Sequence, residues 1–160
     1  MKLSTKGRYA VMAMADLAAI SGGGPVTLAD IASRQSISLS YLEQLFAKLR
    51  RAEVVTSVRG PGGGYRLSRS AAEIRISDII TAVDEPLRAT RCSSAKGCLA
   101  DGRRCVTHDL WDELGRHIFL FLSSVTLEDV TERRLLGSAS GASGRLERAA
   151  GLSLDHEAAE

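Results

Sequence analysis

The stretch that decides the fold is 28–51, which reads LADIASRQSISLSYLEQLFAKLRR. Thr27 precedes it as a candidate N-cap, and Asp30 follows three residues later in a near capping box. This pattern predicts a short helix over 28–34, followed by a turn over 35–37. Apolar residues then recur at spacings of three and four positions, as they do on one face of a second helix. The stretch therefore predicts two helices joined by a tight turn.

The second of these helices is expected to begin at Ser38 or Ser40, either of which can cap it. Its buried stripe consists of Leu42, Leu45, Phe46 and Leu49. Its other face is polar and contains Ser40, Tyr41, Glu43, Gln44, Lys48 and Arg51.

The flanking sequence adds a helix before this pair and a β-hairpin after it. Residues 9–20 are apolar nearly all round and predict a buried helix, which the Gly- and Pro-rich residues 21–25 end. Two short strands are expected over 54–58 and 65–67, on either side of the loop RGPGGG at 59–64. A short helix capped by Ser77 or a neighbour follows over 76–83. The expected fold is mainly α with a small β-hairpin wing, a winged helix-turn-helix.

Charge favours a polyanion as the partner of this first half. Residues 1–70 contain ten Lys and Arg against four Asp and Glu, whereas residues 71–160 contain eleven against fifteen. An α-helix fits the major groove of DNA, and its N-terminus attracts phosphate. A carboxylate such as Glu43 repels phosphate and is tolerated best where it accepts a hydrogen bond from a cytosine amino group. Arg59, beside the glycine loop, suits the negative potential of a minor groove. The candidate DNA-binding residues are Ser38, Ser40, Tyr41, Glu43, Gln44, Lys48, Arg51, Arg59 and Gly60.

A second set of candidate site residues lies further along, at Cys92, Cys98, Cys105 and His108. Three clustered cysteines in a chain without an export signal argue against a disulfide framework. The spacings of five, six and two residues suit an iron–sulfur cluster better than the tight knuckles of structural zinc. Zinc and free redox-sensing thiols remain alternatives. A neutral histidine in place of a thiolate removes a negative charge from the ligand set. Protons also compete with the metal for its imidazole, so a cluster held by such a ligand set should be labile.

From about Thr107 a long helix is expected that is apolar on several sides and therefore needs a second surface to bury against. In a chain of 160 residues a second copy of the chain is the simplest such surface. Thr126 is expected to cap a further short helix to Leu136. Residues 138–160 are rich in Gly, Ala and Ser and predict a disordered tail.

Together these stretches resemble the IscR-type regulators, the iron–sulfur branch of a bacterial winged-helix repressor family. The resemblance covers about residues 1–136 and rests on the opening LSTKGRYA at 3–10, SYLEQL at 40–45, RGPGGGY at 59–65, and Cys105-x2-His108 followed by Leu110-Trp111. It implies a homodimer formed through the long helix and a 2Fe–2S cluster bound by the four candidate ligands. It also implies binding to promoter DNA and control, mostly repression, of iron–sulfur assembly genes. The chain departs from the family in having six residues rather than five between Cys98 and Cys105.

These expectations divide the chain into a DNA-binding domain at 1–84, a cluster-binding loop at 85–106, dimerisation helices at 107–137 and the tail. No apolar run is long enough for a membrane helix and no signal peptide follows the start, so we expect a cytoplasmic protein. No nucleophile–base pair indicates an enzyme. The cluster-assembly machinery is a further expected partner. The alternatives are a nitric-oxide- or iron-responsive member of the same family, or a small zinc or iron–sulfur redox or assembly protein.

Overall fold

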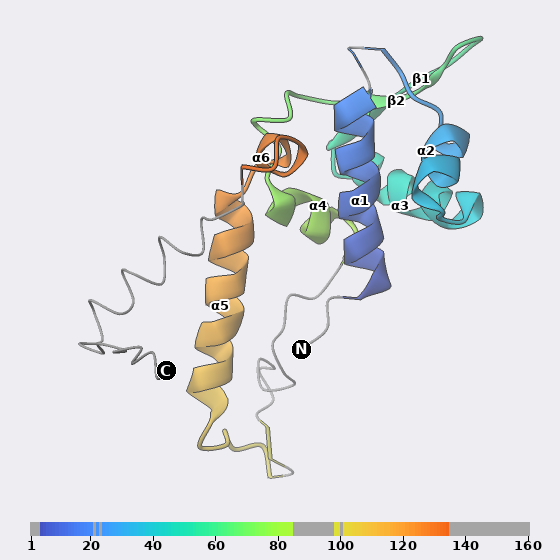
Figure 1. The fold of residues 1–160 in the computed structure, drawn as a ribbon. Helices are drawn as coiled ribbons and strands as arrows, with labels where there is room; N and C mark the ends of the chain where they lie inside the picture. The colour runs from blue at the N-terminus through green and yellow to red at the C-terminus, as the bar shows by residue number, and fades with distance from the viewer. Residues whose placement is uncertain (1–3, 21, 23, 85–97, 100, 135–160) are drawn as a thin grey trace, which may run out of the picture.

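The computed structural model describes residues 4–20, 22, 24–84, 98–99 and 101–134. Within them the fold is mainly helical with one two-stranded antiparallel hairpin, which confirms the expected class (Figure 1). No helix among these residues is long and apolar enough to cross a bilayer. The elements are α1 (Thr5–Ile20), α2 (Leu28–Gln35), α3 (Leu39–Arg51), β1 (Val55–Val58), β2 (Gly64–Leu67), α4 (Ile76–Ala82), α5 (His108–Ser124) and α6 (Leu127–Thr131).

Helix α1 is the centre of the core and begins four residues before the predicted start at Tyr9. It contacts α2, α3, α4 and α6, and Figure 1 shows it running through the middle of the first half of the chain. Several of its buried positions are small, including Gly7, Ala10 and Ala13, which lets neighbouring helices approach closely. The shared core also includes Leu42, Phe46, Leu49, Ile74, Ile79 and Leu127.

The helix–turn–helix has the predicted boundaries. Thr27 caps α2, because its Oγ1 accepts from the Asp30 N–H at 3.2 Å. Ser36 ends α2 in the left-handed region at φ 53°, which turns the chain toward α3. Ser38 is the residue before α3, but its side chain makes no capping hydrogen bond. Its hydroxyl instead lies 3.0 Å from the Ser40 hydroxyl.

The wing is anchored to the helices at its base. Strand β1 pairs with β2 from Val55↔Leu67 to Val58↔Gly64. Beyond the prediction, Val26 and Tyr65 exchange two backbone hydrogen bonds of 2.8 Å, which fixes the segment before α2 against β2. The Tyr65 ring packs edge-on against Phe46 of α3, with centroids 5.0 Å apart. The wing is therefore held to α3 by an aromatic contact.

The helix α4 was predicted to be capped by Ser77 or a neighbour, and of these options Ser77 is wrong. The residue before α4 is Arg75, and the Asp78 carboxylate accepts from its backbone N–H at 3.1 Å. Ser77 lies inside the first turn of the helix and is only 6% exposed. The chain enters α4 from an extended Arg75, so the helix begins two residues earlier than a cap at Ser77 would require.

The long helix α5 is attached to the first half at its C-terminal end. Ile76 N–H donates to Val125 O at 3.0 Å, and Leu127 N–H donates to Ile74 O at 2.8 Å. Figure 1 shows that α5 extends from this junction and away from the three helices α1, α2 and α3. The site residues before α5 therefore lie a full helix length from the junction, about 25 Å for 17 residues.

Helix α6 confirms the predicted cap and corrects the predicted end. Thr126 Oγ1 accepts from the Asp129 N–H and the Asp129 carboxylate accepts from the Thr126 N–H, both at 3.0 Å. The helix ends at Thr131, short of Leu136, because Arg133 takes the left-handed conformation at φ 55°. Residue 136 itself, most of the predicted cluster loop and the predicted tail at 138–160 lie outside the described residues.

Candidate functional site

Helix α3 is buried on one side and polar and exposed on the other. Its stripe of Leu42, Leu45, Phe46 and Leu49 is at most 2% exposed. This packing turns Ser40, Glu43 and Gln44 outward, and all three are exposed along with Ser38. A helix fixed on one side and polar on the other can be inserted into a groove without losing its support. The structure therefore brings these four candidate residues onto one accessible surface.

Tyr41 has a packing role in addition to its predicted one. Its ring meets Tyr9 of α1 edge-on, with centroids 6.1 Å apart and planes at 82°. The residue is half-buried, so α1 limits how the ring can move. An open cavity of about 550 Å³ lies beside this pair and is lined by Thr5, Tyr9, Ser36, Ile37, Ser38 and Tyr41.

The two basic candidates at the end of α3 differ in their partners. Lys48 is half-buried and its Nζ forms an ion pair with Asp84 Oδ2 at 2.8 Å. Arg51 is exposed and has no hydrogen bond or ion pair to another side chain in the part of the chain that the structure describes. Only Arg51 is thus ready to contact a phosphate without first breaking a bond.

The wing tip combines an exposed arginine with a closely folded glycine loop. Arg59 and Gly60 are exposed, and Gly60 takes φ 104° while its carbonyl accepts from Gly63 N–H at 2.9 Å. A Cβ on Gly64 would collide with the Val26 carbonyl, because Val26 pairs with the next residue, Tyr65, through two backbone hydrogen bonds. Arg66 of β2 was not among the candidates predicted from the sequence. It is a second exposed cation on the wing, after Arg59, and its Nε donates to Thr56 Oγ1 at 3.3 Å.

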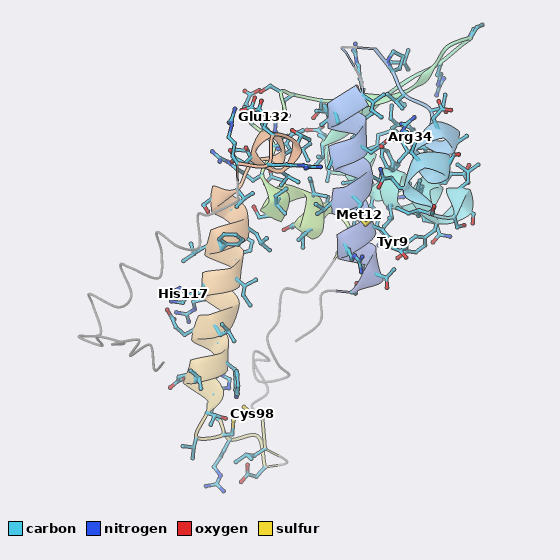
Figure 2. All side chains as sticks on the ribbon, in the orientation of Figure 1. Tyr9, Met12, Arg34, Cys98, His117 and Glu132 are labelled. Carbon is cyan, nitrogen blue, oxygen red and sulfur yellow. The ribbon has the colours of Figure 1, made fainter. Side chains whose placement is uncertain are left out.

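Three of the four candidate metal ligands lie together at the start of α5. Cys98 Sγ lies 2.9 Å from His108 Nδ1, and the Cys105 N–H donates to the same sulfur at 3.5 Å. His108 is the first residue of α5, is 6% exposed, and donates its backbone N–H to Cys105 O at 3.0 Å. Figure 2 shows Cys98 at the free end of the long helix. The fourth candidate, Cys92, lies outside the described residues.

The six-residue spacing between Cys98 and Cys105 is accommodated by a tight turn. The Arg103 carbonyl accepts from both Cys98 N–H at 3.0 Å and Leu99 N–H at 3.1 Å, and Gly102 takes φ 81°. The Arg103 N–H and guanidinium both bond to Asp101, and these contacts hold the pKa of that carboxyl below its usual value. The turn brings the end of the spacer back to its start, so the extra residue does not separate the ligands.

The donor chemistry fits a soft metal centre. Two thiols and an imidazole are ligands of zinc and of iron–sulfur clusters, and an N–H donor beside a sulfur favours a thiolate. Cys105 Sγ, however, lies toward Thr107 Oγ1 at 3.6 Å. Among the described residues no three side chains of these types are already arranged around one point. The side chain of His117, further along α5, is 69% exposed, and its Nε2 lies 3.2 Å from Glu113 Oε1.

Helix α5 leaves a large apolar surface uncovered. Several of its hydrophobic side chains are between 39% and 63% exposed, and Val106 just before it is fully exposed. An exposed apolar area of this kind on a small chain indicates an interaction surface. The exposed side chains on α5 are Leu110, Leu114, Phe119, Leu120 and Phe121.

A family profile and curated relatives both match most of this chain. The Rrf2 family profile, described as "Iron-dependent Transcriptional regulator", matches residues 3–133. The chain is 59% identical over 133 residues to an HTH-type transcriptional regulator of Azotobacter vinelandii, covering 83% of this chain and 80% of the relative. It is 55% identical over 134 residues to the HTH-type transcriptional regulator IscR of Photorhabdus laumondii, covering 84% and 81%.

Solved structures agree with these relatives. The structure of T. potens IscR matches with a TM-score of 0.68 at 40% identity, covering 84% of this chain and 88% of that one. CymR, the global cysteine regulator of B. subtilis, matches with a TM-score of 0.70 at 36% identity, covering 83% and 98%.

Proposed function

Because the chain belongs to the Rrf2 family of transcriptional regulators, in its IscR-type branch, we propose that it represses iron–sulfur cluster assembly genes. In this proposal it acts as a cytoplasmic homodimer whose binding to promoter DNA depends on a labile 2Fe–2S cluster. The proposed units are the DNA-binding domain at 1–84, the cluster loop at 85–106 and the dimerisation helices at 107–137.

The observation that carries the cluster assignment is the contact between Cys98 Sγ and His108 Nδ1, at 2.9 Å. Cys105 stands three residues before His108, and its backbone contacts both His108 and the Cys98 sulfur. We propose that these three residues and Cys92 hold the cluster. When bound, a 2Fe–2S cluster would supply a prosthetic group that is lost when iron or sulfide is scarce.

The exposed face of α3 is the proposed reader of the promoter. Gln44 and the two serines suit hydrogen bonds to base edges or phosphates, and Glu43 suits a cytosine amino group. Arg59 at the wing tip would enter the neighbouring minor groove, where the glycines allow the backbone to approach closely. Arg51 would bind a phosphate, and so would Lys48 if it left Asp84.

The uncovered apolar face of α5 supports the homodimer. Two copies of this face would bury Leu110, Leu114 and Phe121 against each other and place two α3 helices on one duplex. Delivery of the cluster requires contact with assembly proteins, which are the second proposed partner. A nitric-oxide- or iron-responsive role remains the alternative, and the iron-dependent description of the family favours iron over nitric oxide.

The cluster is tested by anaerobic reconstitution with iron and sulfide, followed by visible spectroscopy and metal analysis. Wild type should gain a visible chromophore, and Cys92→Ala should lose it while remaining a folded dimer. Ser93→Ala, at the next position, is the matched control and should keep the chromophore. A Cys92→Ala protein that keeps the full chromophore would show that the ligand assignment is wrong. Exposure of the loaded protein to nitric oxide or to an iron chelator separates the alternative signals.

The wing is tested by titrating a labelled promoter duplex. Arg59→Ala should weaken binding by roughly 1–3 kcal/mol. Arg134→Ala, just after α6, is the control, since it removes an equally positive side chain whose ion pairs are with acids of α6 and the residue that follows it. An unchanged affinity for Arg59→Ala would exclude the minor-groove role.

A further inference from the structure

Asp84 stands at the point where the chain leaves the DNA-binding domain. It is the last described residue before 85–97, the segment that contains Cys92. Its N–H donates to Thr81 O at 3.0 Å, and its φ of 53° ends helix α4 in the left-handed region. Few L-residues adopt this conformation at low cost, and the short polar Asp and Asn are among them.

Asp84 contacts two other helices through two different groups. Its carboxylate Oδ2 accepts from Lys48 Nζ of α3 at 2.8 Å. Its backbone carbonyl accepts from Lys6 Nζ of α1, also at 2.8 Å. The bond from Lys48 holds the pKa of the Asp84 carboxyl below its usual value, so this group is charged at neutral pH.

The apolar core does not by itself fix this side of α3. An open cavity of about 680 Å³ lies between the C-terminal half of α3, helix α4 and the exposed Phe119 of α5. Lys48 and Asp84 both line it. The buried stripe holds the other side of α3, and a polar contact beside this open space adds a second constraint on the C-terminal half of the helix.

We propose that Asp84 is a positioning residue that fixes the recognition helix α3 relative to α1, through Lys48 and Lys6, at the exit toward the ligand segment. The inference rests on the proposed function, in which α3 reads the promoter. It changes the role expected for Lys48. The Lys48 ammonium would hold α3 in position through Asp84 instead of binding a phosphate, and Arg51 would bind the phosphate.

Simple electrostatics and this proposal predict opposite signs for one substitution. Removing a negative charge from a DNA-binding surface, and freeing a lysine beside it, should strengthen binding to every duplex regardless of sequence. Loss of a positioning contact should instead weaken binding to the preferred sequence, because base contacts depend on the placement of α3. The ratio of affinities for a preferred and a scrambled duplex separates the two.

The experiment uses the full chain with Asp84→Asn and Asp84→Gly. Both replacements tolerate φ 53°, so the end of α4 is kept and the backbone carbonyl still reaches Lys6. Fluorescence anisotropy at fixed salt measures affinity for a duplex selected by wild type from a random pool, and for its scrambled version. We expect both variants to lower the preferred-to-scrambled ratio about fivefold, within the range of such couplings. A ratio equal to wild type, with tighter binding to both duplexes, overturns the proposal.

Two further measurements exclude a general loss of stability. Glu128→Gln removes an acid of α6 from its ion pair with Arg134, at a place far along the chain from α3, and should leave the ratio unchanged. Lys48→Gln should lower the ratio as Asp84→Asn does, and the double variant should lose no more than either single one. Additive losses would mean that the two residues act separately and would overturn the proposal. Failure of wild type to select any sequence would overturn the proposed function, and this inference with it.

Discussion

Helices α3 and α5 are both amphipathic and both predicted functional elements, but they bury very different surfaces. Helix α3, with 13 residues, buries four large apolar side chains in the shared core. Helix α5, with 17 residues, buries only His108, and most of its leucines and phenylalanines are exposed. Helix α3 is therefore held by the shared core, whereas the apolar side chains of α5 lack a comparable cover among the described residues. The one residue that α5 buries is a predicted cluster ligand.

The sharpest test of this contrast compares two phenylalanines. Phe46 of α3 is fully buried and Phe121 of α5 is 55% exposed. Phe46→Ala should lower the free energy of unfolding by about 3–5 kcal/mol, because it leaves a cavity in the core. Chemical denaturation monitored by circular dichroism measures this loss.

Phe121→Ala is the matched substitution. At protein concentrations low enough to favour the monomer, it should lower the free energy of unfolding by less than about 1 kcal/mol. At higher concentrations it should weaken dimerisation, which analytical ultracentrifugation measures. Equal losses for the two variants in the monomer would contradict the contrast between the helices.

A smaller effect is expected for the buried ion pair that joins α1 to α2. The Asp16 side chain is 4% exposed and accepts from Arg34 Nη2 at 2.7 Å and Gln35 Nε2 at 2.8 Å. Asp16→Ala should cost about 2 kcal/mol of stability, because Arg34 and Gln35 lose a nearly buried acceptor, while the Arg34 side chain, 35% exposed, still reaches water.

The control for Asp16 lies on α5, where Asp112 pairs with Arg116 at the same distance of 2.7 Å. This pair is solvated, so Asp112→Ala should change stability by less than about 0.5 kcal/mol. Thermal unfolding of both variants at one ionic strength compares them. A cost for Asp112→Ala as large as that for Asp16→Ala would mean that α5 is supported within the chain after all.

The same division explains what could be predicted from sequence. Local patterns determined the helix–turn–helix, its Thr27 cap, the hairpin and the start of α5, because capping, periodicity and glycine turns act over a few residues. The Val26–Tyr65 pairing and the links from Asp84 to Lys6 and Lys48 join distant parts of the chain. No local pattern encodes which distant partner a lysine or an edge backbone will meet.

The site shows the same limit. The identities of Cys98, Cys105 and His108 were visible as a spacing, but the turn at Gly102 that brings the first two together was not. The cap of α4 was misassigned to Ser77 because a serine near a helix start is usually a cap. Burial in the core at 6% exposure decided otherwise, and a sequence pattern does not carry that information.

The smallest predicted effect separates a structural cap from a functional one. Thr126 caps α6 with a 3.0 Å bond to the Asp129 N–H, and Ser38 stands before α3 with no capping bond. Thr126→Ala should therefore lower the free energy of unfolding by about 1 kcal/mol and leave DNA affinity unchanged. Ser38→Ala should leave the unfolding free energy unchanged and weaken binding to a promoter duplex, because its hydroxyl is exposed beside Ser40 at the end of α3 proposed to meet DNA. Denaturation and anisotropy titrations on the same two proteins measure both quantities. If Ser38→Ala lost stability and kept its affinity, the start of α3 would be a structural element and the proposed reading surface would have to begin at Ser40.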